Sequence, residues 1–120
     1  MYERHIIGQK GEDYVTKYLI DLSYKIIERN FECKLGEIDI IAYDNQKEEL
    51  VFIEVKTRTN KKYGNPADAV DTTKKKHIIK SANYYLYIHN LIDKINVRID
   101  VIEVYLSNNL YKINHIKQIM

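Results

Sequence analysis

The chain has 120 residues, 19 of them basic and 17 acidic, and the net charge of +2 excludes binding to nucleic acid through overall charge alone. Its one cysteine, Cys33, excludes an internal disulfide and any zinc site made of several cysteines. No apolar run approaches the roughly 20 residues of a membrane helix, and the charged N-terminus does not resemble a signal peptide. We therefore expect one cytoplasmic domain over residues 1–120 with no membrane partner.

The first half of the chain predicts one helix followed by three strands. Apolar residues recur at steps of three and four over residues 3–22, which indicates an amphipathic helix over this range. Its predicted inner face extends from Ile7 to Leu22. Strands are predicted over 24–33, 37–42 and 50–57, the last being rich in β-branched residues. On the helix, Glu12 falls at the edge of the apolar stripe and Asp13 faces water.

The second half predicts a helix over residues 73–89, whose inner face runs from Ile78 to His89, and strands over 97–106 and 110–116. The order is then helix, three strands, helix, two strands. This order, without repeats or linkers, indicates an α/β fold that packs helices on one sheet. On the strand over 97–106, Arg98 and Asp100 share a face and are predicted to form a structural ion pair.

The strand over residues 50–57 carries the first candidate functional residues. Glu54 and Lys56 are two apart and point to one face, while Val55 points to the other. If the strands over 37–42 and 50–57 form a hairpin centred on the polar loop between them, Asp39 lies directly opposite Glu54. The hairpin therefore predicts two carboxylates and one lysine within contact distance of each other.

Two carboxylates this close repel unless they share a proton, a lysine or a metal ion. Mg²⁺ prefers oxygen ligands, and such a site can support attack of water on a phosphodiester. Lys56 could then activate that water or balance charge, with Glu12 as an outer acid. Two structural interpretations stay open: a surface ion pair between Glu54 and Lys56, and a buried charge network that fixes strand register.

Basic residues gather between residues 57 and 80. The run can be a solvated loop and helix start, or a rim that contacts phosphates. The residues predicted for such a rim are Arg58, Lys61, Lys62 and Lys74. Arg58 could equally be a solvated strand end, whereas Lys74 opens a helix whose dipole favours anions.

Asp39 followed by Glu54-Val55-Lys56 resembles the PD-(D/E)xK signature of restriction-endonuclease-like nucleases, including archaeal Holliday junction resolvases. Over nearly its whole length, the chain is similar to the small bacterial YraN-type family. The motifs that carry this likeness are Gly8-Gln9-Lys10-Gly11-Glu12, Arg29-Asn30-Phe31, Gly36-Glu37-Ile38-Asp39, Val51 to Arg58, Gly64-Asn65-Pro66, Ala69-Val70, Lys74 and Arg98-Ile99-Asp100-Val101.

The resemblance implies a restriction-endonuclease-like fold, in which helices flank a central mixed sheet. It also implies a Mg²⁺ or Mn²⁺ site at Asp39, Glu54 and the carbonyl of Val55, with Lys56 beside it and Glu12 as an accessory acid. The chain departs from the superfamily in lacking a glutamine in the second helix, where Lys74 lies nearby.

Three functions are compatible with these observations. The first is a metal-dependent endonuclease that cleaves DNA, including branched or single-stranded forms. The second is a nuclease-like module of DNA repair or recombination that binds nucleic acid without cutting it. The third is a structural partner subunit, for which Lys61, Lys62 and Lys74 would be dispensable in DNA retention. A homodimer would suit cleavage of two strands, although no sequence feature proves one.

Overall fold

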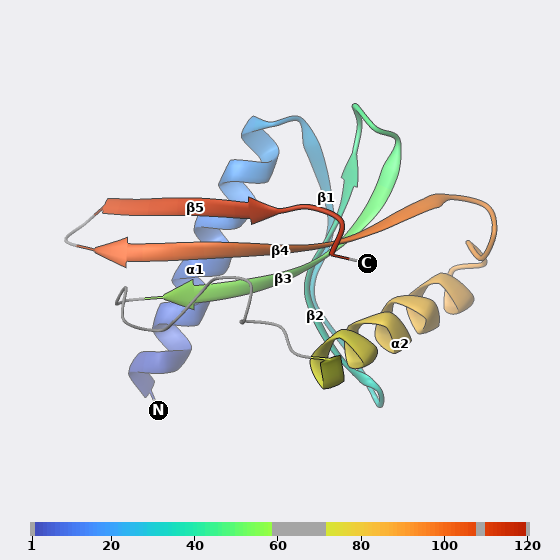
Figure 1. Cartoon of the computed structure of the whole chain (residues 1–120), viewed down its shortest axis with the longest axis horizontal. Coiled ribbons are helices and arrows are strands. Elements are labelled where there is room, and N and C mark those ends of the chain that lie inside the picture. The colour runs from blue at the N-terminus through green and yellow to red at the C-terminus, as the bar shows by residue number, and fades with distance from the viewer. Residues whose placement is uncertain (1, 59–71, 108–109, 120) are drawn as a thin grey trace.

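The computed structural model describes residues 2–58, 72–107 and 110–119. Two helices and five strands follow in the predicted order (Figure 1). They are α1 (Tyr2–Asp21), β1 (Tyr24–Cys33), β2 (Gly36–Asp44), β3 (Glu49–Arg58), α2 (Thr72–Ile88), β4 (Asn96–Ser107) and β5 (Leu110–Ile116). The strands form one sheet in the order β1-β2-β3-β4-β5, in which β3 and β4 are parallel and all other neighbours antiparallel. The predicted α/β fold with a mixed sheet between helices is confirmed, and it is consistent with a restriction-endonuclease-like fold.

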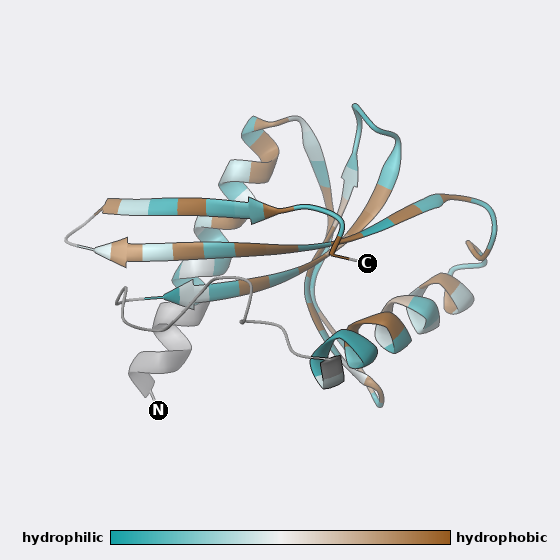
Figure 2. Ribbon diagram, viewed as in Figure 1, coloured by the Kyte–Doolittle hydropathy of each residue, from teal (hydrophilic) through white to brown (hydrophobic). Residues whose placement is uncertain are grey.

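The two faces of the sheet carry separate hydrophobic clusters, and each cluster packs against one helix. On the α1 face the buried residues are Val15, Leu19, Tyr24, Ile40, Ala42, Val51, Ile53, Ile102 and Val104. On the α2 face they are Phe31, Ile38, Ile41, Leu50, Phe52, Ile78, Ala82, Tyr85, Leu86, Ile99 and Val101. In Figure 2 the apolar segments gather in the middle of β3 and β4, between the two helices. Neither described helix is long and apolar enough to cross a membrane.

Helix α1 lies close to β3 because it carries a glycine at the contact. A Cβ atom on Gly11 would lie 3.1 Å from the Cβ of Thr57, tighter than a well-packed contact allows. The predicted inner face is confirmed at Val15 and Leu19, which are fully buried. It is wrong at Leu22, which is 44% exposed because the helix ends at Asp21.

Strands β2 and β3 form the predicted hairpin in the predicted register. Ile40 pairs with Ile53 and Ala42 with Val51, so the same alignment continued by one residue sets Asp39 opposite Glu54. The paired residues end at Ile40 and Ile53, before these acids are reached. The strand segments that carry Asp39 and Glu54 therefore lie at the open end of the hairpin.

Helix α2 packs its predicted inner face on the sheet. Ile78, Ala82, Tyr85 and Leu86 are buried, whereas His89 is exposed, against the prediction, because the helix ends at Ile88. His89 still contacts the core from outside, since its ring centroid lies 4.2 Å from that of Tyr85.

The predicted pair of Arg98 and Asp100 is confirmed, and it belongs to a larger buried network on the α1 face. Arg98 Nε lies 2.9 Å from Asp100 Oδ1, and its Nη1 lies 3.0 Å from Asp44 Oδ2. Asp100 also accepts from His115 on β5 at 2.7 Å. This network joins β2, β4 and β5. Because Arg98 and Asp100 are nearly or fully buried, water cannot solvate either charge if its partner is removed.

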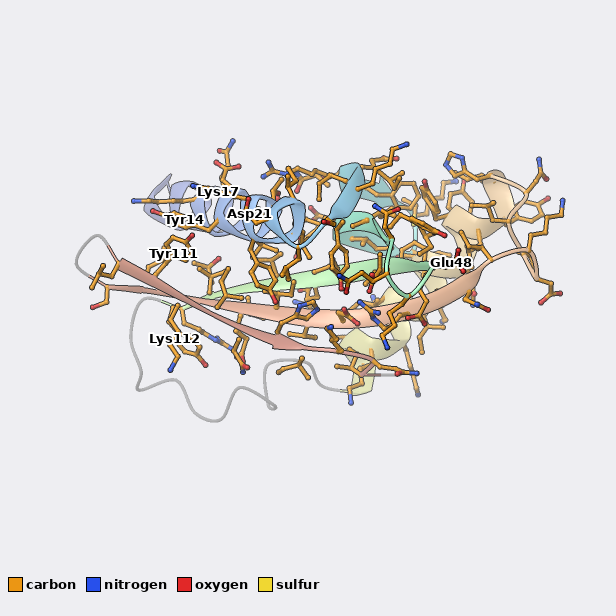
Figure 3. All side chains as sticks on the ribbon, turned by 90° about the horizontal axis from the view of Figure 1, so that it is seen from above. Tyr14, Lys17, Asp21, Glu48, Tyr111 and Lys112 are labelled. Atoms are coloured by element: carbon orange, nitrogen blue, oxygen red, sulfur yellow. The ribbon has the colours of Figure 1, made fainter. Side chains whose placement is uncertain are left out.

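Strand β5 is held to α1 by aromatic contacts as well as to β4 by its backbone. The rings of Tyr14 and Tyr111 are stacked at 4.0 Å between centroids, and Figure 3 shows the two side chains facing each other between α1 and β5. The Tyr18 hydroxyl lies 2.9 Å from His115 Nδ1. The tyrosines of α1 are thus packing residues, as their helical spacing predicts.

Candidate active site

Asp39 is fixed by a backbone hydrogen bond at the point where β2 and β3 part. Its Oδ2 accepts from the N–H of Val55 at 2.8 Å, just beyond the last paired residues, Ile40 and Ile53. The side chain thereby takes the place that a backbone carbonyl of β2 would hold in a continued strand pair. This hydrogen bond turns the Asp39 carboxyl group toward β3.

Glu54 lies close enough to Asp39 to change its protonation. Burial, together with the negative charge of Glu54, raises the pKa of Asp39 to about 8, and the hydrogen bond from Val55 only partly opposes this. Glu54 is itself buried, with 9% of its side chain exposed. The predicted meeting of two carboxyl groups is therefore present, and near neutral pH Asp39 holds a proton when no other cation compensates the pair.

Two lysines contact one oxygen of Glu54. Lys56 Nζ lies 3.4 Å from Oε1, and Lys74 Nζ from the first turn of α2 lies 2.8 Å from the same atom. Burial and the neighbouring Lys74 lower the pKa of Lys56. Burial would also lower the pKa of Lys74, but the hydrogen bond to Glu54 outweighs it and the pKa is raised. The lysine predicted to lie on the rim is thus part of the acidic site.

Glu12 approaches the same site from α1. Burial raises the pKa of Glu12, although Arg29 on β1 opposes the shift from 3.5 Å away. The negative charge of Glu12 in turn contributes to the raised pKa of Asp39. Asp13 binds Arg29 more closely, at 2.8 Å, but 61% of its side chain is exposed. The division predicted from helical periodicity is confirmed: Glu12 borders the core and Asp13 faces water.

Glu103 is a buried acid on the same face of the sheet as Lys56, and the sequence reasoning missed it. It is fully buried on β4 directly beside Lys56, and its Oε1 accepts from Asn114 at 3.1 Å. Its Oε2 has no hydrogen-bond partner among the described residues. The available signal was an acid between Ile102 and Val104 in an apolar strand, since such an acid is rarely buried without a role.

The oxygen atoms at Asp39 and Glu54 fit a hard divalent cation. Asp39 keeps its proton near neutral pH beside the buried Glu54, and a divalent cation could take the place of that proton. The carbonyl of Val55 points to the same side of β3 as its N–H, and therefore toward Asp39. The described residues hold no cluster of three histidine, cysteine or acidic side chains, so water or phosphate oxygens would complete the shell of Mg²⁺ or Mn²⁺.

The remaining residues of the predicted basic rim are only partly described. Arg58 ends β3 and is half-buried, beside Tyr105 of β4. Lys61 and Lys62 lie outside the described residues. Figure 2 shows a hydrophilic start of α2, where Lys76 is exposed. Of the rim residues, Arg58 and Lys74 thus lie on the same side of the sheet as the acids.

Residues 11–104 match the family described as Uncharacterised protein family UPF0102. Similar proteins include UPF0102 proteins of Caldanaerobacter subterraneus, 46% identical over 92% of this chain and 90% of the relative, and of Caldicellulosiruptor bescii, 43% identical over 92% and 93%. A UPF0102 protein of Clostridioides difficile is 45% identical over 91% of both chains. The matched region contains Glu12, Asp39, Glu54, Lys56 and Lys74, and the chain belongs to the UPF0102 family.

Proposed function

We propose that this protein is a divalent-metal-dependent endonuclease that cleaves phosphodiester bonds in DNA, with branched or single-stranded DNA as its substrates. The observation that carries the proposal is the pair of buried acids, Asp39 and Glu54, with Lys56 on the same strand. Paired acids beside a lysine are the residue types that phosphodiester cleavage uses to hold a metal ion and activate water. The family description names no activity, so this assignment depends on the site itself.

Each residue has a role that its surroundings support. Asp39, Glu54 and the Val55 carbonyl would hold Mg²⁺ or Mn²⁺, which when bound supplies Lewis-acid stabilisation of charge on the phosphoryl group. Lys56 is half-buried with a lowered pKa, which suits a group that orients water or accepts its proton. Glu12 has a raised pKa and can hold a proton for the leaving oxygen.

DNA is the proposed partner because cations accompany the acids on one side of the sheet. Arg58 follows Lys56 by two residues and lies on the same face of β3, where it can contact a phosphate next to the cleaved one. Lys61 and Lys62, which follow in the sequence, are proposed to extend this contact. A homodimer, which would place two such sites on two strands, remains a prediction.

One observation favours the second candidate, a module that binds DNA without cutting it. Glu54 already has two lysines on one oxygen, and the described residues offer only two acids in direct contact for a metal. If these lysines satisfy the acids permanently, the site is a charge network of the kind that fixes strand register. The two candidates differ in whether the acids bind a divalent cation.

The test uses labelled single-stranded, duplex, flap and four-way-junction DNA, each with and without Mg²⁺ or Mn²⁺. Asp39→Ala and Lys56→Ala should each reduce cleavage by about 10²- to 10⁴-fold. Asp13→Ala removes an exposed acid and should leave the rate unchanged, which controls for net charge. Metal-dependent cleavage that only the two site variants lose would establish the enzyme.

Absence of cleavage by the unaltered protein on all four DNAs would overturn the enzyme assignment. Filter retention of the same DNAs at rising salt then decides between the remaining candidates. Retention that falls steeply with salt and is equal in Asp39→Ala identifies the binding module. Loss of retention in a variant of Lys61 and Lys62 would exclude the structural subunit.

A further inference from the structure

The shortest ion pair of Glu54 comes from a residue whose position in its own helix is unfavourable. Lys74 lies in the first turn of α2, where the helix dipole favours negative charge, and that turn contains no acid. It lies four residues before the buried Ile78, and thus on the side of α2 that faces the sheet. Lys76 lies two residues farther along and is exposed. Helix stability therefore does not account for an ammonium group at this position.

The partner that accounts for it is Glu54. The 2.8 Å from Lys74 Nζ to Glu54 Oε1 is shorter than the 3.4 Å from Lys56 to the same oxygen. The acid is almost wholly buried, whereas 42% of the Lys74 side chain is exposed. The lysine side chain can therefore turn toward water, while Glu54 cannot leave the sheet.

We propose that Lys74 is an internal counter-ion that occupies the position of the divalent cation on Glu54 and must release the carboxylate before the cation binds. This inference rests on the proposed metal-binding function and adds a competition that regulates the same site. Lys74 is a positioning residue in this scheme, because it acts through Glu54 and not on the substrate. An ammonium group and a divalent cation repel each other at contact distance, so Lys74 and the cation compete for the carboxylate of Glu54.

The competition has two measurable signs. Without metal, removal of Lys74 leaves two close carboxyl groups with less positive charge, so the fold becomes less stable. With metal, the same removal eliminates a competitor, so the cation binds more tightly. A lysine that only stabilises the fold would produce the first effect without the second.

The experiment measures Mn²⁺ binding by electron paramagnetic resonance and calorimetry, after treatment with a chelator, in the unaltered protein and in Lys74→Gln. The variant should bind Mn²⁺ about 3- to 10-fold more tightly, as expected when one partly exposed ammonium leaves a carboxylate. Its Tm should be lower than that of the unaltered protein without metal, and equal or higher in saturating Mn²⁺. Lys74→Arg, which keeps the charge, should preserve the weaker affinity.

Lys76→Gln is the matched control, because it removes the same charge from an exposed position of the same helix. If Lys74→Gln and Lys76→Gln tighten Mn²⁺ binding equally, the effect is net charge and the inference is wrong. If the unaltered protein binds Mn²⁺ and Lys74→Gln binds it equally or more weakly, the inference fails and the proposed function stands. If neither binds Mn²⁺, both are overturned.

Discussion

The backbone N–H of Val55 donates a 2.8 Å hydrogen bond to Asp39 Oδ2 at the end of the paired segment of β2 and β3. Two consequences follow from this one contact. It fixes a buried carboxyl group against a strand that cannot move without disrupting the sheet, and it aims the group at Glu54. The cost is a charged group buried beside a second acid: burial, together with the negative charge of Glu54, raises the pKa of Asp39 to about 8.

Asp39→Asn should stabilise the protein without metal and remove part of the pH dependence of its stability. Native Asp39 keeps its proton up to about pH 8, whereas the unfolded chain loses it at about pH 4. Unfolding therefore releases a proton in this window, and the free energy of unfolding falls as pH rises. The variant should gain roughly 1 kcal/mol or more at pH 8, a Tm increase of about 3–6 °C, and almost nothing at pH 4.

Scanning calorimetry of both proteins in a chelator, at about pH 4 and pH 8, checks this expectation. Asp13→Asn serves as the control, since that acid is exposed and should show no such difference. A Tm gain for Asp39→Asn that is equal at both pH values would show that the raised pKa of Asp39 is not its cause.

Gly11→Ala should destabilise the protein although alanine is the better helix former. The helix gains about 1 kcal/mol from the substitution, but the new methyl group meets Thr57 at a contact that is already tight. We expect a net loss of about 1–2 kcal/mol in urea unfolding. Thr57→Ala in the same chain should recover part of it, and additive effects of the two substitutions would contradict the proposed contact.

Glu12→Gln should slow metal-dependent cleavage without changing the fold. Glu12 is half-buried and acts on Asp39, whereas the neighbouring Asp13 contacts Arg29 from the solvent side. If Glu12 holds a proton for the leaving oxygen, its loss should reduce the rate by about 10- to 100-fold. Asp13→Asn should keep the full rate, and equal rates for the two variants would remove Glu12 from the site.

Asp100→Asn should destabilise the protein at neutral pH and reduce its sensitivity to acid. Burial alone would raise the pKa of Asp100, but hydrogen bonds from His115 and Arg98 outweigh it and hold the pKa below its usual value. A lowered native pKa contributes stability above about pH 4, which is lost as pH falls through the native pKa. We expect a loss of about 3–5 kcal/mol at pH 7 and a flatter curve below pH 4.

Urea unfolding at several pH values measures both effects. Asp21→Asn is the control, because this acid is exposed at the end of α1. If the free energy of unfolding of Asp100→Asn falls below pH 4 as steeply as that of the unaltered protein, the acid sensitivity belongs to another member of the network. Asp44, whose pKa is also lowered, is such a member.

Local sequence patterns predicted every described helix and strand, and also the register of β2 with β3. That register follows from one rule: the centre of a polar loop sets which residues face each other. Among the described side chains of the two inner faces, periodicity failed beyond the helix ends, at Leu22 and His89. An apolar or aromatic residue just after a helix continues the pattern without continuing the backbone. The parallel pairing of β3 with β4 has no local signal of this kind.

Asp39 and Glu54 were predictable as a pair because they lie on one hairpin, but their partners come from distant segments. Lys74 reaches Glu54 from α2, and Glu103 lies beside Lys56 only because β4 adds to β3 in parallel. No spacing along the chain encodes either contact. The sequence therefore predicted Asp39 beside Glu54, but it predicted neither the contact of Lys74 with Glu54 nor the position of Glu103.

The connectivity of the sheet also has a kinetic consequence. Strands β1, β2 and β3 are joined by short turns, whereas β3 meets β4 only after the chain has passed through α2. Since local pairs form before distant ones, Asp39 and Glu54 should meet in the hairpin before α2 delivers Lys74. Repulsion between the two acids should then act before Lys74 compensates it, and refolding should be slower than in a chain that lacks one of the acids.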